Sequence, residues 1–159
     1  MTGASTIRAA VERRGMYESI LVPTDGSTGT ADTLDHAVAI GRDNDATVHG
    51  LYVVDRRQYR AAEGDTKDEV RKSLELEGER ALEDIRTRVA DAGLSASTDC
   101  RDGIPHREVG DYADEQDVDL VVMGTHGRTG RDRVANLGSV TQRVVKQVKV
   151  PVLVVDIGE

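Results

Sequence analysis

The sequence predicts an α/β fold in which one parallel sheet is covered by helices on both faces. Five short segments with strand patterns, most of them apolar runs, alternate with amphipathic stretches that have helical spacing. Two of these runs, 20–22 and 120–123, are continuously apolar, which is typical of central strands buried on both sides. The chain of 159 residues contains no Trp and no Phe, so Val, Leu, Ile and Ala must build its core.

The first half of the chain begins with a strand at 20–22, which we expect Pro23 to end. A helix follows, with Ser27 or Thr28 as its cap and apolar residues on one side: Leu34, Ala37, Val38 and Gly41. A second strand is expected at 47–54. A long helix, closed by Gly93, is marked by Val70, Leu74, Ala81, Leu82, Ile85 and Val89.

The second half continues the alternation with a third strand at 95–101. Pro105 suits the first turn of a third helix that turns three residues inward: Val109, Tyr112 and Ala113. The fourth strand is 120–123. A fourth helix starts at Ser139, with its apolar residues at Val140, Val144, Val145 and Val148, and the fifth strand is 152–155.

The strand patterns indicate an order for the sheet. Strand 95–101 alternates between small or apolar residues and polar ones, which suits an edge. A flavodoxin-like order, with strands one and four adjacent in the middle, fits these patterns, but other orders fit them too. The fifth strand, Val152–Val155, has no polar residue, and a bare apolar edge invites pairing with another chain. We therefore expect a homodimer through this strand; residues 1–15 or a helix covering it are the alternative.

Composition narrows the class of protein. Residues 1–15 are polar and are interpreted as a flexible extension, with one domain at 16–159. The formal net charge of −8 argues against nucleic acid and anionic membranes as partners. No apolar stretch approaches a membrane span and no secretory signal is visible, so a cytoplasmic location is expected. The single cysteine, Cys100, is interpreted as a small core residue on a strand.

Candidate ligand-binding residues gather where strands one and four end. In a doubly wound sheet, ligands bind beyond the carboxyl ends of the strands, where the chain order reverses. Segments 23–27 and 124–130 would meet there, together with Gly138 and Ser139 at a helix start. Glycines allow backbone amides to approach phosphate oxygens closely, and a helix start adds hydrogen-bond donors. Asp25 faces the same crevice and is a candidate for a metal ion or a ribose hydroxyl.

The glycine-rich loop matches neither of the common phosphate-binding motifs. No GxxxxGK[ST] occurs, and no GxGxxG follows the first strand. Spaced glycines alone would favour ordinary turns, but the succession of strand, glycines, Gly-Ser and helix favours a phosphate site. Other side chains with suitable chemistry are His106, His126, Arg128, Arg131 and Arg133, of which His106 is the one expected merely to cap a helix or contact solvent.

Five segments in this order resemble the universal stress protein family: 20–27, 103–106, 122–130, 138–140 and 151–155. The resemblance covers Tyr17 to Asp156, and it implies the family's flavodoxin-like (adenine nucleotide α-hydrolase-like) fold with strand order 3-2-1-4-5. The ATP-binding branch of that family has the signature Gly, two residues, Gly, nine residues, Gly, Ser or Thr. Gly124, Gly127 and Gly138-Ser139 match it, except that ten residues separate Gly127 from Gly138. We expect the loop around 131–136 to absorb the extra residue.

The resemblance implies ATP as the ligand, with Mg²⁺ or Mn²⁺ near Asp25 and the adenine near Val53. The implied binding residues are Pro23, Thr24, Asp25, Val53, Gly103, Met123, Gly124, Gly127, Arg128, Gly138, Ser139 and Val140. It implies a nucleotide-dependent switch in the stress response, acting on an unknown signalling partner. No catalytic triad is visible, so slow or conditional ATP hydrolysis is expected at most.

Two alternatives stay open at this stage. An interaction module of the same fold that binds no nucleotide would account for the extra loop residue. A flavodoxin-type electron carrier is the other, but a flavin needs aromatic residues around its ring. The chain has neither Trp nor Phe, and its four Tyr residues lie away from the glycine loop in the sequence.

Overall fold

The computed structural model describes residues 16–125 and 137–157. Its five strands form one sheet in the order β3-β2-β1-β4-β5, and every pairing between neighbours is parallel. The strands are β1 (Ser19–Thr24), β2 (Thr47–Asp55), β3 (Ser95–Gly103), β4 (Leu120–Gly124) and β5 (Val152–Val155). This confirms the predicted fold class and the strand order that the family resemblance implied.

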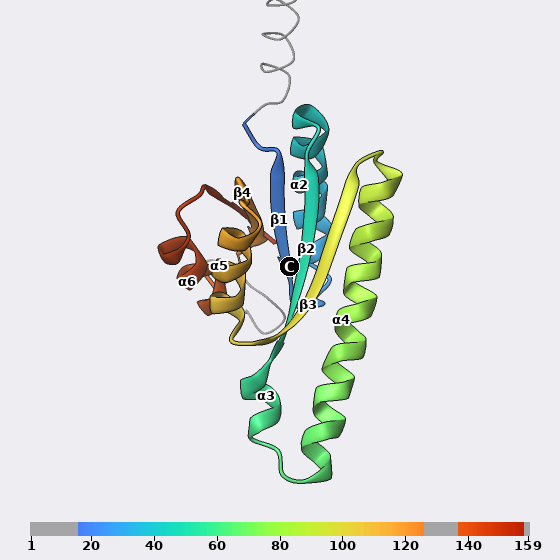
Figure 1. Cartoon of the computed structure of the whole chain (residues 1–159), viewed down its shortest axis with the longest axis vertical. Helices are drawn as coiled ribbons and strands as arrows, with labels where there is room; N and C mark the ends of the chain where they lie inside the picture. Colours follow the sequence, from blue (N-terminus) through green and yellow to red (C-terminus); the bar gives the residue numbers. More distant parts are fainter. Residues whose placement is uncertain (1–15, 126–136, 158–159) are drawn as a thin grey trace, which may run out of the picture.

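Five helices occur in the described residues: α2 (Thr30–Asn44), α3 (Arg56–Arg60), α4 (Asp65–Asp91), α5 (Pro105–Glu115) and α6 (Ser139–Gln147). Helices α2 and α4 cover one face of the sheet, and α5 and α6 cover the other (Figure 1). Successive side chains of β1 therefore point to opposite faces of the sheet and pack into different hydrophobic cores. Ile20 packs with Leu34, Leu82 and Ile85, whereas Leu21 packs with Val109, Val121 and Val144.

Strands β1 and β4 are buried almost throughout, as their continuous apolar sequences predicted. Strand β3 is an edge and its first residues alternate between exposed and half-buried, which confirms that expectation too. Cys100 lies half-buried on β3 against the α2–α4 core, and burial raises the pKa of its thiol. A protonated, packed thiol fits the predicted core role.

Two boundaries differ from the sequence prediction near β1. Pro23 does not end the strand, which continues to Thr24 beside β2. The described pairing of β1 with β4 covers only Ile20 and Leu21, so at Pro23 the strand no longer has partners on both sides and the missing N–H is tolerated. The expected cap of α2 was also wrong: Gly29 is the N-cap and no side chain caps the helix.

Helix α3 was not predicted, and α4 begins earlier than its apolar pattern indicated. Figure 1 shows α3 and the first turns of α4 projecting beyond the carboxyl ends of the strands. Farther along, α4 approaches β2 closely at Gly78, where an added Cβ would lie 2.4 Å from the Tyr52 ring. Gly93, at φ +80°, follows the end of α4 as expected.

The fifth strand forms the other edge of the sheet, and Val152, Leu153 and Val154 are only half-buried. On α6, Val144 is fully buried, whereas Val145, which also belongs to the apolar pattern of the helix, is 42% exposed. It lies next to Val144 on the helix and so faces about 100° away from it. Among the described helices, none combines the length and apolar character needed to cross a membrane.

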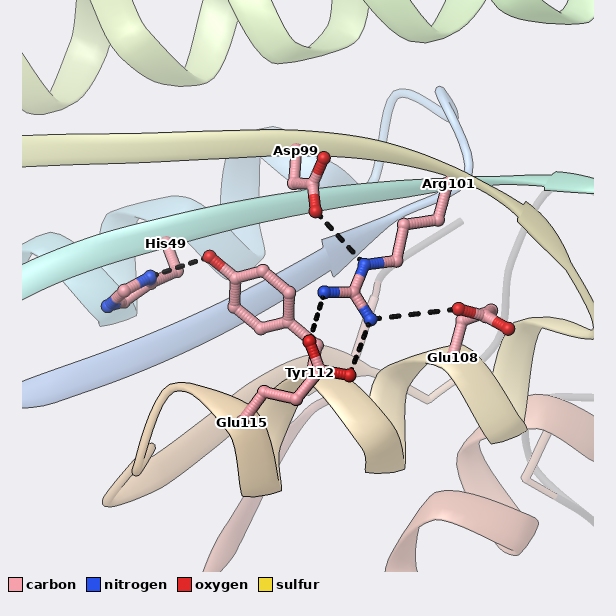
Figure 2. Close-up of polar contacts among 6 residues, drawn as sticks. All are labelled: His49, Asp99, Arg101, Glu108, Tyr112 and Glu115. Atoms are coloured by element: carbon pink, nitrogen blue, oxygen red, sulfur yellow. Dashed lines mark hydrogen bonds and ion pairs between the residues drawn. The ribbon is translucent and has the colours of Figure 1, made fainter.

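Helix α5 is fixed to the sheet by a polar cluster around Tyr112 (Figure 2). The Tyr112 hydroxyl lies 2.7 Å from Nδ1 of His49, and His49 Nε2 lies 2.7 Å from Oγ of Ser19. The Arg101 guanidinium stands 5.0 Å from the centre of the Tyr112 ring and binds Glu115 on α5 through 2.7 Å and 3.2 Å hydrogen bonds. These contacts tie α5 to β1, β2 and β3, and so hold its first turn at the carboxyl edge.

Candidate functional site

A cavity of about 580 Å³ opens at the carboxyl edge of the sheet, a volume within the usual range for small-molecule sites. It is lined from β1, β2, β4 and the helices that follow them, which is the predicted switch point of the chain order. Nine of the predicted site residues line it: Pro23, Thr24, Asp25, Val53, Met123, Gly124, Gly138, Ser139 and Val140.

The turn after β1 forms one wall of this cavity. The buried Thr24 hydroxyl accepts a 3.0 Å hydrogen bond from the Gly26 N–H and lies 2.8 Å from the Thr30 hydroxyl. Gly26 has φ +83°, a conformation that glycine adopts without strain. Oδ1 of Asp25 accepts the Ser27 N–H at 2.9 Å. The turn therefore holds an exposed carboxylate at the cavity mouth.

The start of α6 forms the facing wall. The first hydrogen bond within this helix runs from the Gln142 N–H to the Gly138 carbonyl, and no side chain caps the helix. The amides of Ser139, Val140 and Thr141 thus have no acceptor from the helix itself. These donors carry the positive end of the helix dipole, and the Ser139 hydroxyl adds another donor.

The loop between β4 and α6 is closed at its base. The Gly138 N–H donates a 2.7 Å hydrogen bond to the Thr125 carbonyl, and the Thr125 N–H donates to the Val155 carbonyl at 2.9 Å. Thr141 donates from its hydroxyl to the Gly124 carbonyl at 2.8 Å. Both ends of the loop are therefore fixed against the sheet. The Gly138 amide, however, is used in this closure.

The end of β2 forms the third wall, together with the first turn of α5. Asp55 caps α3 by accepting the Arg57 N–H at 3.0 Å, and it binds the Arg57 side chain through Nε at 2.9 Å and Nη2 at 2.8 Å. Burial opposes ionisation of Asp55, but the hydrogen bonds and charge of Arg57 outweigh this and lower its pKa. Pro105 and Val109 complete an apolar surface beside Val53.

On the α4 side, the cavity is lined by Leu74, Glu77 and Tyr52. The Tyr52 hydroxyl donates to Oε2 of Glu77 at 2.9 Å, and the ring is buried against α4. Tyr52 therefore belongs to the cavity even though it lies far from the glycine loop in the sequence.

The other predicted residues fall outside this lining. Gly103 is buried at the end of β3 and faces the Glu108 side chain, so it is not part of the cavity surface. Gly127 and Arg128 lie outside the described residues, as do His126, Arg131 and Arg133. His106 is half-buried in the first turn of α5; desolvation, and then the charges of Arg143, Arg107 and Arg57, lower its pKa.

A protein-only metal centre was not found in the parts of the chain that the structure describes, where no three His, Cys, Asp or Glu side chains are suitably grouped.

Several lining residues were missed by the sequence prediction, notably Asp55, Arg57 and Thr141. Asp55 had a usable signal, because it ends β2 directly after the apolar residues Val53 and Val54, much as Asp25 comes directly after β1. Arg57 and Thr141 had none, since their position depends on an unpredicted helix and on the closure of the loop.

The sequence profile of the universal stress protein family matches residues 16–156. The chain belongs to the universal stress protein family. One relative, universal stress protein MJ0531 of Methanocaldococcus jannaschii, is 37% identical over 142 residues, covering 88% of this chain and 82% of its own length. Membership disfavours the flavodoxin-type alternative.

Solved structures of the family agree with this assignment. The structure of M. jannaschii protein MJ0577 superposes with a TM-score of 0.83 at 33% identity, covering 91% of this chain and 99% of that one. A universal stress protein solved in complex with cAMP has a TM-score of 0.69 at 26% identity, covering 91% of this chain and 100% of that one.

Proposed function

We propose that this universal stress protein binds ATP, together with Mg²⁺ or Mn²⁺, in the cavity at the carboxyl edge of its sheet. The observation that carries the proposal is the pairing of two walls: the open N-terminus of α6, with Ser139 and Val140, and the carboxylate of Asp25. Amide donors at a helix start suit phosphate oxygens, and a carboxylate nearby suits a divalent ion held by those phosphates.

The two ends of the cavity differ in polarity as an adenine nucleotide requires. The end beside α6 offers N–H and hydroxyl donors, whereas the end beside Val53 offers apolar side chains from Val53, Val109 and Met123. The closed loop base supports this assignment, because it fixes the start of α6 and its amides beside the end of β4. The family member solved with cAMP shows that this fold accommodates an adenine nucleotide.

The proposed role is that of a nucleotide-dependent switch in the stress response, with slow or conditional hydrolysis at most. A signalling partner is expected to distinguish the occupied protein from the empty one, because a ligand favours the conformation that it binds more tightly. Asp25 and His106 are available near the cavity, but the described residues offer no base held by a second group against a reacting water.

Calorimetric titration tests the proposal, using ATP, ADP and AMP with and without Mg²⁺. We expect ATP to bind and Asp25→Ala to weaken its binding at least tenfold, equivalent to about 1.4 kcal/mol. Asp32→Ala is the matched control, because Asp32 is also an exposed aspartate next to the site but does not line the cavity. A wild-type protein that binds none of the three nucleotides would instead be an interaction module of the same fold.

We also propose a homodimer through β5, whose edge is apolar and half-buried in a single chain. Pairing of this edge with its two-fold mate would satisfy its backbone groups and cover Val152 and Val154. The expected result is a dimeric mass by light scattering. Val154→Lys is expected to give a monomer, and a wild-type monomer at micromolar concentration would contradict the proposal.

A further inference from the structure

Arg57 lies on the α5 side of the cavity, at the end where the proposed function puts the base. Side chains alternate along a strand, so Asp55 points to the same face of β2 as Val53, whose neighbours belong to the core under α5. Because Arg57 folds back onto Asp55, its guanidinium also lies on that face, beyond Val53 and opposite the first turn of α5.

The guanidinium of Arg57 is held in a fixed orientation. Asp55 binds its Nε and Nη2 atoms at 2.9 Å and 2.8 Å, which is the paired geometry of a guanidinium and a carboxylate. The Asp55 side chain is only 14% exposed and also caps α3, so this anchor is itself well fixed. The contacts use one edge of the guanidinium, and they leave its planar faces for other contacts.

None of the four tyrosines competes for this position, since each of them is placed elsewhere. Tyr17 precedes β1 at the opposite end of the sheet, and Tyr52 packs against α4 on the other face. Tyr59 and Tyr112 each have an arginine over the ring instead, at 5.7 Å for Arg71 and 5.0 Å for Arg101. The protein thus already pairs guanidinium groups with aromatic rings twice.

We propose that Arg57 holds the base of the bound nucleotide, with its guanidinium plane stacking on the ring. This inference rests on the proposed nucleotide function. Guanidinium planes stack on nucleobases, and a fixed plane loses little freedom when it does so. The ion pair with Asp55 offsets the charge of Arg57, so the side chain recognises the flat base and does not draw the phosphates away from α6.

The test compares the wild type with Arg57→Ala and Arg57→Lys by calorimetry, using ATP, CTP and inorganic tripolyphosphate. Arg57→Ala is expected to bind ATP about tenfold more weakly, as for the loss of one stacked base, and to lose less affinity for CTP, whose smaller ring stacks less strongly. Arg57→Lys should lose as much ATP affinity, because a lysine keeps the positive charge but has no planar group that can stack on the base. Tripolyphosphate affinity should be the same in all three proteins.

Arg60→Ala is the matched control, because Arg60 lies on the same short helix but does not line the cavity. Circular dichroism and thermal unfolding establish that each variant is folded. If the wild type binds no ATP, the proposed function itself fails. If ATP binds and Arg57→Ala is unchanged, or Arg57→Lys restores binding, or tripolyphosphate binding falls with ATP binding, only the stacking role is overturned.

Discussion

The phosphate-binding role of α6 can be tested by removing a single backbone donor. Ser139 is the first residue of the helix, where proline is well tolerated because the N–H has no helical acceptor. Gly138 precedes it with φ −63° and ψ 157°, an extended conformation that a following proline favours. Ser139→Pro should therefore preserve the fold while it deletes both the amide and the hydroxyl.

The size of the effect follows from the kind of hydrogen bond lost. An amide that donates to a charged phosphate contributes about 1.5–3 kcal/mol. Its loss corresponds to a roughly 10- to 150-fold weaker affinity for ATP. Ser139→Ala removes the hydroxyl alone, so the difference between the two variants isolates the amide.

Calorimetry with ATP and Mg²⁺ gives the affinities, and urea denaturation of the same proteins establishes that stability is retained. The proline variant should bind ATP at least tenfold more weakly than the alanine variant. Equal affinities in two folded proteins would refute the assignment of the α6 amides to phosphate.

Three further predictions concern the metal, the α5 anchor and the core. Asp25→Asn should reduce ATP affinity more in Mg²⁺ than in EDTA; an equal loss in both would exclude a role at the ion. Burial lowers the pKa of His49 from its ordinary 6.5, so the unfolded chain takes up the proton first and stability falls as pH drops below about 6.5. In urea denaturation, the free energy of unfolding of His49→Gln should therefore fall less between pH 8 and pH 5.5 than that of the wild type. An equal fall in both proteins would contradict this prediction. Gly78→Ala should cost about 1–3 kcal/mol, because the added Cβ meets the buried Tyr52 ring, and a variant of unchanged stability would show that the ring can move.

Much of the fold was predictable because each element carries a local signal. The buried strands β1 and β4 contain the continuous apolar runs 20–22 and 120–123, and Pro105 and Ser139 stand at the first positions of α5 and α6. The strand order needed the family resemblance, because burial patterns alone identify central and edge strands without ordering them. The start of α2 was misplaced because Gly29 lies there without any side-chain cap.

The candidate site was predictable where it depends on strand ends and unpredictable where it depends on tertiary contacts. Asp25 and Gly138 follow from their positions at the carboxyl edge, whereas Val53 was implied by the family resemblance. Arg57 reaches the cavity only because α3 turns the chain back after Asp55. Gly103 was predicted from the family resemblance, but a Cβ placed on it would meet the Glu108 side chain and not the cavity.

A crystal structure of the chain with ATP and Mn²⁺ would examine both walls of the cavity at once. The predicted result is a polyphosphate on the amides of Ser139 and Val140, with the metal ion between it and Asp25 and the adenine beside Val53. A nucleotide bound elsewhere on the protein, or phosphates turned away from the start of α6, would contradict this account.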